Sequence, residues 1–167
     1  MKIMFICTGN ICRSAMAEGM LKKLLEEKGI HNVEVYSCGT YAETGDSATY
    51  NAIEVAKLYG ADISMHRATN IRDSRINDMD VILCACISHK QSVEYLYPYL
   101  KGKVYTIKEY ANLDRGGRDK DIKDPWGCDM NIYQNCAKEI KDCLEKIIIK
   151  ITWEQMRNGD SSKFSKK

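Results

Sequence analysis

Four short apolar runs alternate along the chain with longer segments in which apolar residues recur every three or four positions. The runs lie at residues 2–6, 33–36, 81–85 and 104–107. Continuous apolar runs are typical of buried strands in a parallel sheet, and the alternating pattern of residues 33–36 also predicts a strand. The longer segments have the spacing of amphipathic helices and lie at residues 13–28, 47–59, 88–99 and 131–153. Strands that alternate with helices predict a single α/β domain of three layers, in which helices cover both faces of a central four-stranded parallel sheet.

The ends of the predicted helices carry the expected residue types. Gly29 and Gly60 follow the first two helices, and the third has Ser88 as its predicted cap and Pro98 near its end. The predicted buried face of the second helix consists of Ala52, Ile53, Val55, Ala56 and Leu58. That of the last helix consists of Ile132, Cys136, Ile140, Cys143, Leu144, Ile147 and Ile151. Both cysteines of that face are therefore expected in the core.

The loop between the first predicted strand and the first predicted helix carries the strongest candidate chemistry. Its sequence is Cys7-Thr8-Gly9-Asn10-Ile11-Cys12-Arg13-Ser14. A loop of this length can turn its backbone N–H groups inward at the start of a helix, which creates an anion site. Gly9 and Asn10 tolerate the positive φ that such a curl needs. Arg13 adds a planar guanidinium that can bind two phosphoryl oxygens at once.

Cys7 is the candidate nucleophile of this loop. The positive field of the loop and of Arg13 favours the thiolate form, so that no histidine base is needed. Ser14 has two candidate roles, because its hydroxyl can donate to the sulfur or cap the helix. A cysteine at the end of a buried strand is often a small core residue. The complete string between a strand and a helix favours the catalytic interpretation.

The loop and the segment Met16-Ala17-Glu18 together resemble the N-terminal signature of the low-molecular-weight protein tyrosine phosphatases. Asp124-Pro125-Trp126-Gly127 is similar to the acid loop of that family. The resemblance covers about the first 150 residues, and Ala15 stands where the family usually has proline. Lys108-Glu109-Tyr110 and Gly127 are closer to the bacterial branch, which includes protein-arginine phosphatases. The resemblance implies that substrate phosphate is bound by Thr8, Gly9, Asn10, Ile11, Cys12 and Arg13.

Asp124 is the candidate general acid. A phosphate ester leaves slowly unless its oxygen is protonated, and the acid must therefore lie opposite the thiolate. Pro125 fixes the backbone after Asp124, and Trp126 can stack on the ring of a substrate. Asp-Pro turns are also common on surfaces. The other nearby aspartates do not precede a proline; they are Asp114, Asp119, Asp121 and Asp129.

The resemblance implies supporting roles for three further residues. His66 is expected to join Asn10 and Ser14 in a hydrogen-bonded network that supports the loop. Tyr41 follows a turn that lies beside the active loop in the family, and it either forms a wall of the pocket or is an ordinary surface tyrosine. Cys12 either forms a reversible disulfide with Cys7 that protects the nucleophile from over-oxidation, or packs under the loop.

These residues predict a protein tyrosine phosphatase that forms a phosphocysteine intermediate, with Cys7 as nucleophile, Arg13 as phosphate clamp and Asp124 as general acid and base. Position 11 faces the pocket if the resemblance holds. Ile11 offers an apolar contact to a phenyl ring, whereas the arginine-specific branch has threonine there. The expected partner is a phosphorylated protein, and the expected product is inorganic phosphate.

Three other functions fit parts of the sequence. The first is a protein-arginine phosphatase with the same mechanism. The second is a thiol-linked arsenate reductase, which needs two further cysteines; Cys84 and Cys86 are only two positions apart and would face the same way on a strand. The third is a module that binds phosphate without turnover, against which the combination of Cys7, Ser14 and Asp124 argues.

Composition narrows the environment in which this chemistry is expected. The 167 residues carry a net charge of +2, which gives no reason to expect nucleic acid or an anionic membrane as a partner. No apolar run resembles a signal peptide or a membrane span, so a cytoplasmic location with reduced cysteines is expected. The histidines and cysteines lack metal-ligand spacing, and no metal or other cofactor is expected. Residues 158–167 are polar and lysine-rich, which predicts a disordered tail after a domain of residues 1–157.

Overall fold

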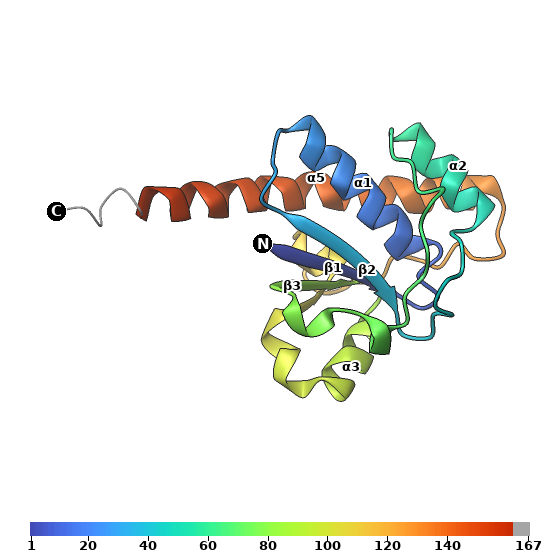
Figure 1. Ribbon diagram of the computed structural model, residues 1–167, viewed down its shortest axis with the longest axis horizontal. Coiled ribbons are helices and arrows are strands. Elements are labelled where there is room, and N and C mark those ends of the chain that lie inside the picture. The colour runs from blue at the N-terminus through green and yellow to red at the C-terminus, as the bar shows by residue number, and fades with distance from the viewer. Residues whose placement is uncertain (162–167) are drawn as a thin grey trace.

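The computed structural model describes residues 1–161 of the chain and shows the predicted α/β domain (Figure 1). Its strands are β1 (Lys2–Cys7), β2 (Glu34–Gly39), β3 (Val81–Cys84) and β4 (Val104–Thr106). Its α-helices are α1 (Arg13–Glu27), α2 (Tyr50–Leu58), α3 (Ile87–Leu96), α4 (Ile107–Tyr110) and α5 (Met130–Ser161). Short 3₁₀ helices are η1 (Ile71–Asp73), η2 (Ile76–Asp78) and η3 (Pro98–Lys103). The four strands are parallel, as predicted, and the structure places them in the order β2-β1-β3-β4.

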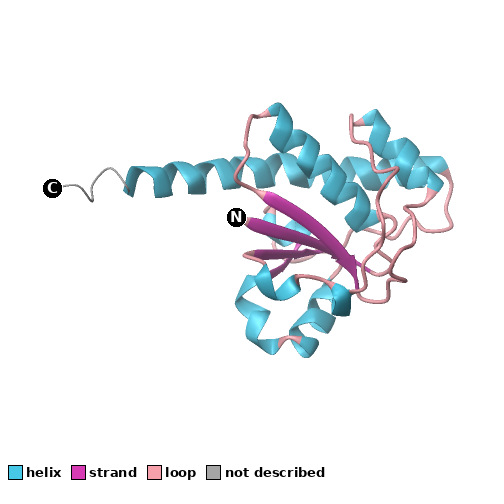
Figure 2. Ribbon diagram, in the orientation of Figure 1, coloured by secondary structure: helices cyan, strands magenta, loops and turns pink. Residues whose placement is uncertain are grey.

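The sheet has a hydrophobic core on each face, because alternate residues of each strand point to opposite sides. Ile3 and Phe5 pack toward α1, α2 and α5, whereas Met4 and Ile6 pack toward α3 and the 3₁₀ helices. Figures 1 and 2 show these helices on opposite sides of the strands. The prediction of three layers is therefore confirmed, and Cys136 and Cys143 are buried in the core of the α5 side.

The topology places the end of β1 at a crevice of the sheet. The chain order reverses between β1 and β3, since β2 lies on one side of β1 and β3 and β4 lie on the other. In open parallel sheets, ligands bind beyond the carboxyl ends of the strands at such a reversal. Cys7 is the last residue of β1 and lies at this point.

Two element boundaries differ from the predictions because of long-range pairing. Strand β2 continues through Ser37 to Gly39, which pairs with Cys7, whereas a turn was predicted after Tyr36. Helix α2 begins only at Tyr50, because the side chain of Thr49 caps it by accepting a hydrogen bond from Ala52 N.

The predicted face of α2 and the predicted cap of α3 also need correction. Leu58 is 67% exposed at the end of α2 and does not belong to its buried face. Helix α3 is capped by Cys86 and not by Ser88. The Cys86 N–H donates to Nδ1 of His89, and the backbone N–H of His89 donates to the Cys86 sulfur.

Helix α5 continues beyond its predicted end at Trp153 to Ser161. It therefore includes residues 158–161, which were predicted to be disordered; residues 162–167 lie outside the described part of the chain. The final turns of α5 run past the edge of the sheet (Figure 1). Glu154, Gln155 and Met156 are strong helix formers, and no proline stops the helix there.

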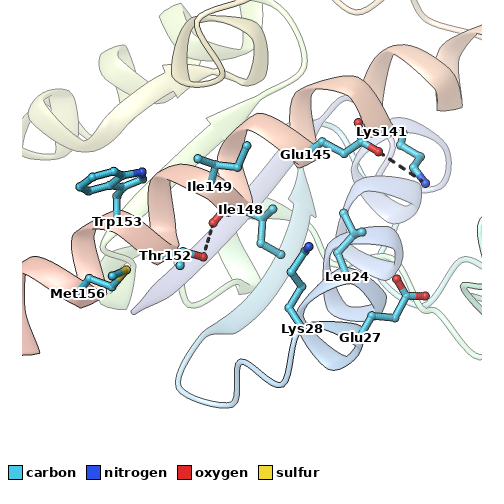
Figure 3. A pocket seen from close by; sticks show the side chains of 10 residues that line it. All are labelled: Leu24, Glu27, Lys28, Lys141, Glu145, Ile148, Ile149, Thr152, Trp153 and Met156. Atoms are coloured by element: carbon cyan, nitrogen blue, oxygen red, sulfur yellow. Dashed lines mark hydrogen bonds and ion pairs between the residues drawn. The ribbon is translucent and has the colours of Figure 1, made fainter.

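Helices α1 and α5 enclose a groove of about 630 Å³, which we call the outer groove (Figure 3). It is lined by Leu24, Glu27, Lys28, Lys141, Glu145, Ile148, Ile149, Thr152, Trp153 and Met156. Its charged side chains lie at the rim, where Lys141 and Glu145 approach to 3.8 Å. None of the described helices combines the length and the apolar character that a membrane span needs.

Candidate active site

The loop after β1 has the curled backbone that the sequence predicts. Asn10 has a φ of 56°, which is the left-handed conformation that asparagine tolerates better than most residues. Gly9 does not have a positive φ, so the prediction for that residue was wrong. A β-carbon on Gly39 would lie 2.4 Å from Thr8 O and 2.9 Å from Asn10 N, which means that β2 contacts the loop backbone directly. A glycine is required there because of this close approach.

A chain of hydrogen bonds ends at the sulfur of Cys7. The backbone N–H of Thr69 donates to Oδ1 of Asn10, which fixes the orientation of the Asn10 amide. Nδ2 of Asn10 then donates to the hydroxyls of both Ser14 and Ser37, each at 2.8 Å. Because the Ser14 oxygen already accepts from Asn10, its proton is free for the Cys7 sulfur 2.9 Å away. When Cys7 is a thiolate it can only accept, and Ser14 then donates to the sulfur, which was one of its two predicted roles.

The other end of the chain is the carboxylate of Glu18 on α1. The Ser37 hydroxyl donates to Oε1 of Glu18 at 2.8 Å. Since a carboxylate can only accept, the Ser37 hydroxyl donates to Glu18 and accepts from Asn10, so the Asn10 amide donates toward both ends of the chain. The sequence analysis gave no role to Ser37, Thr69 or Glu18.

His66 supports the loop in a different way from the prediction. Its Nε2–H donates to the backbone carbonyl of Asn10 at 2.6 Å. Among the described hydrogen bonds, none joins His66 to Ser14. The predicted pair of Asn10 and Ser14 is present, and His66 braces the backbone of that pair.

Arg13 is the first residue of α1, and its side chain is held from two sides. Nη1 donates to Ile122 O at 2.9 Å and to the Cys86 sulfur at 3.0 Å. Nη2 lies 3.5 Å from Oδ2 of Asp124. Burial opposes the charge of this guanidinium, but the neighbouring Cys7, Cys86 and Asp124 outweigh burial and raise its pKa. Within the described part of the chain, Nε of Arg13 is a buried side-chain nitrogen without a hydrogen-bond partner.

Asp124 lies at the mouth of the site, as predicted, and it is half-exposed. Its Oδ1 accepts from the backbone N–H of Trp126 at 3.1 Å. The turn closes with a hydrogen bond from Cys128 N to Pro125 O, and Gly127 has the φ of 75° that this turn needs.

These residues enclose a pocket of about 310 Å³, which we call the active pocket. It is lined by Cys7, Thr8, Gly9, Ile11, Cys12, Arg13, Asp124 and Trp126. Tyr41 does not line this pocket; it is 81% exposed and lies on a neighbouring hollow. The prediction of Tyr41 as a pocket wall was therefore wrong, because the longer β2 carries the following turn outward. Ile11 and Trp126 form apolar walls, as predicted.

Cys12 lies five residues after Cys7 in the same loop, is buried, and contacts Tyr133 of α5. Its sulfur lies 3.2 Å from the Tyr133 hydroxyl and 3.7 Å from that of Thr49. Burial raises the pKa of Cys12, so it is a neutral thiol near neutral pH. All eight cysteines are unpaired in this structure. The disulfide between Cys7 and Cys12 stays a prediction.

His89 of α3 was missed by the sequence analysis and holds Thr8. Its Nδ1 accepts from Cys86 N, so the proton of the neutral ring is on Nε2, which lies 2.8 Å from the Thr8 hydroxyl. Burial and the positive Arg13 lower the pKa of His89 to about 4. No group of three His, Cys, Asp or Glu side chains in the described part of the chain is arranged to hold a metal ion.

Comparisons with known proteins agree with this geometry. The family described as "Low molecular weight phosphotyrosine protein phosphatase" matches residues 2–157. A protein-arginine-phosphatase of Bacillus subtilis is 33% identical over 148 residues, which is 88% of this chain and 94% of that protein. The low-molecular-weight protein-tyrosine-phosphatase PtpB of Staphylococcus epidermidis is 32% identical over 151 residues, with 90% and 99% of the two chains covered.

Solved structures show the same fold. The low-molecular-weight protein tyrosine phosphatase of T. tengcongensis superposes with a TM-score of 0.82 at 38% identity, covering 90% of this chain and 99% of that chain. The YwlE arginine phosphatase, in a mutant with a phosphorylated active-site serine, superposes with a TM-score of 0.83 at 30% identity, covering 91% and 96%. The chain therefore belongs to the low-molecular-weight protein tyrosine phosphatase family, whose members are cysteine-dependent hydrolases.

Proposed function

We propose that this protein is a tyrosine phosphatase that hydrolyses phosphorylated proteins through a phosphocysteine at Cys7. One observation carries the proposal: the Cys7 sulfur, oriented by Ser14, lies in one pocket with the Arg13 guanidinium and the Asp124 carboxyl. The unpartnered Nε of Arg13 supports the same conclusion. A buried donor without an acceptor is costly, and a phosphoryl oxygen would supply that acceptor.

The first step transfers the phosphoryl group to the enzyme. The Cys7 thiolate attacks phosphorus, and the S–P bond forms while the bond to the leaving oxygen breaks. Arg13 and the loop N–H groups hold the three equatorial oxygens. Asp124, in its protonated form, gives its proton to the leaving oxygen.

The second step restores the enzyme. Water attacks phosphorus and passes a proton to the Asp124 carboxylate, and the S–P bond breaks with its electron pair returning to Cys7. The Ser14 hydroxyl, which donates toward the sulfur, stabilises the thiolate that leaves. The product is inorganic phosphate. The phosphorylated serine in the related YwlE mutant supports a covalent phosphoenzyme.

The walls of the active pocket favour phosphotyrosine. Ile11 and Trp126 present apolar surface on the way to Cys7, which fits a phenyl ring. A specific observation also favours phosphoarginine, because two relatives at 32–33% identity are named protein-arginine phosphatases. The resemblance implies that the protein-arginine phosphatases have threonine at the position of Ile11, whereas this chain has isoleucine.

A comparison of matched peptides tests the choice of substrate. We expect a higher kcat/KM for a phosphotyrosine peptide than for a phosphoarginine peptide of the same sequence. Ile11→Thr should lower this ratio by about tenfold, because it replaces an apolar wall with a hydroxyl. Ile149→Thr in the outer groove is the matched control and should leave the ratio unchanged. A wild-type preference for phosphoarginine would overturn the choice of tyrosine while leaving the phosphocysteine mechanism intact.

A further inference from the structure

A second hollow opens beside the active pocket, and we call it the side hollow. It has a volume of about 400 Å³ and is lined by Thr40, Tyr41, Asn70, Ile71, Arg72, Ser92, Tyr95 and Leu96. The chemistry described above uses none of these residues. We propose that the side hollow binds an acidic side chain of the protein substrate, two or three residues from the phosphorylated residue. This inference rests on the proposed function, since it names what else the same substrate contacts.

The side hollow is joined to the active pocket through the backbone. Thr40 N donates to Cys7 O and Tyr41 N donates to Thr8 O, each at 3.0 Å. The wall formed by α3 is tied to the same place, because His89 bonds the Thr8 hydroxyl. A polypeptide that places its phosphoryl group on the loop therefore passes over these residues if it runs toward α3.

The spacing along α3 sets the distance between the two sites. Ser92 lies one turn beyond His89 on the same side of the helix, and Leu96 lies about one turn further. With a rise of about 1.5 Å per residue, the hollow extends roughly 5 to 10 Å outward from the contact of His89 with Thr8. An extended peptide covers about 3.3 Å per residue, so two or three residues span this distance.

The lining selects an acidic side chain. Of the described residues that line the side hollow, Arg72 alone carries a charge. Arg72 is exposed, and no ion pair joins it to a carboxylate in the described part of the chain, whereas Arg75 of the same segment pairs with Asp78 at 3.3 Å.

The remaining lining provides the apolar support for a bound segment. The rings of Tyr41 and Tyr95 are 81% and 85% exposed, and the floor is the buried Ile71. Exposed aromatic side chains around an unpaired guanidinium are typical of surfaces that bind a protein segment.

Peptide hydrolysis tests the inference. Phosphotyrosine peptides would carry a single glutamate or a single lysine at one of the positions two or three residues before or after the phosphotyrosine. At one or more of these positions, wild-type enzyme should hydrolyse the glutamate peptide with a kcat/KM about fivefold above that of the lysine peptide. Arg72→Glu should invert this ratio. Lys146→Glu on α5 makes the same change of charge on the opposite face of the sheet and should leave the ratio at its wild-type value.

A second variant separates apolar contact from charge. Tyr95→Ala should raise KM about two- to threefold for every peptide in the set, while the glutamate-to-lysine ratio stays as in wild type. A ratio near one at all four positions in the wild-type enzyme, or a ratio that Arg72→Glu does not change, would overturn the inference.

Para-nitrophenyl phosphate keeps this test separate from the proposed function. It has no flanking residues, so its hydrolysis reports the chemistry of Cys7 alone. If phosphotyrosine peptides are not cleaved but phosphoarginine peptides are, the same glutamate and lysine series in phosphoarginine peptides measures the side hollow. If the proposed tyrosine phosphatase activity is wrong, phosphotyrosine peptides are not hydrolysed. If the proposed role of the side hollow is wrong, peptides are hydrolysed but the glutamate and lysine peptides have the same kcat/KM.

Discussion

The active pocket and the outer groove differ in how their polar groups are arranged. The groove is larger, with about 630 Å³ against about 310 Å³. Its polar groups are rim charges such as Lys141 and Glu145, which pair with each other along α5. In the active pocket, a sulfur, a guanidinium and a carboxyl converge, and a chain of buried hydrogen bonds centred on the Asn10 amide supports the sulfur. Convergent polar groups, and not volume, therefore identify the site of chemistry.

The largest effect is expected at the sulfur. Cys7→Ser should lower kcat roughly 10⁴-fold or more, because a hydroxyl at neutral pH is a poor nucleophile and the partner of this side chain is the Ser14 hydroxyl, which is not a base. Binding of inorganic phosphate, measured by titration calorimetry, should stay within a few fold of wild type, since Arg13 and the loop backbone remain. Turnover by Cys7→Ser at more than a hundredth of the wild-type rate would contradict the role of Cys7.

Asp124→Ala should have the next largest effect, and its size should depend on the leaving group. Hydrolysis of an alkyl or unactivated phenyl phosphate should slow by about 10²- to 10³-fold, because these oxygens need a proton to leave. Hydrolysis of para-nitrophenyl phosphate should slow far less. A series of aryl phosphates measures this as a steeper dependence of kcat on leaving-group acidity. Equal losses across the series would argue against a role as general acid.

The chain of hydrogen bonds from Glu18 gives a more moderate prediction. Glu18→Ala should lower kcat about tenfold, because Ser37 loses its acceptor and no longer holds in place the Asn10 amide that donates to Ser14. Glu18→Gln keeps an oxygen that can accept from Ser37, and it should recover most of the activity. Glu27→Ala removes a carboxylate from the outer groove and serves as the control. If Glu18→Ala and Glu27→Ala have the same kcat, the chain is structural and does not act on the sulfur.

Acid should destabilise the active-site side of the molecule through His89. Its pKa is about 4 in the folded protein and near 6.5 in the unfolded chain. A lowered pKa means that the unfolded chain binds the proton more readily than the folded protein. The contribution of neutral His89 to the free energy of unfolding is therefore complete above pH 6.5 and is lost as the pH falls toward 4. The loss should reach roughly 2–3 kcal/mol in urea unfolding between these pH values, and His89→Gln should flatten that slope. A slope that is unchanged in the variant would assign the pH dependence to other groups.

The two regions also differ in how well the sequence predicts them. The roles of Cys7, Arg13 and Asp124 come from short contiguous motifs, and the structure places all three at one pocket. Ser37, Thr69 and His89 act through pairing with residues about 30 to 80 positions away, which no local pattern encodes. Tyr41 was misplaced for the same reason, since the pairing of β2 with β1 decides where the following turn lies.

In helix α5 the local sequence pattern predicts the buried part of the helix but not its exposed end. Its inward face was predicted correctly from Cys136 to Ile151, because burial imposes the helical period, whereas Ile132 is only half-buried and Tyr133 is the buried residue there. Beyond Ile151 the helix leaves the sheet, and its apolar residues no longer mark a core. Trp153 was therefore interpreted as the end of the helix, although the strong helix formers Glu154, Gln155 and Met156 follow it and α5 continues to Ser161.

The smallest effect is expected at Trp153 in the outer groove. It gives the sharpest test of the difference between the outer groove and the active pocket. Trp153 is 63% exposed on α5, so Trp153→Ala removes little buried area and should change the free energy of unfolding by less than about 1 kcal/mol. Ile147, six residues earlier on the same helix, is fully buried, and Ile147→Ala should cost about 2–4 kcal/mol. Neither variant should alter KM for para-nitrophenyl phosphate, because neither residue lines the active pocket. A loss of activity in Trp153→Ala at unchanged stability would show that the outer groove affects the chemistry at Cys7. The conclusion that the two regions act independently would then be wrong.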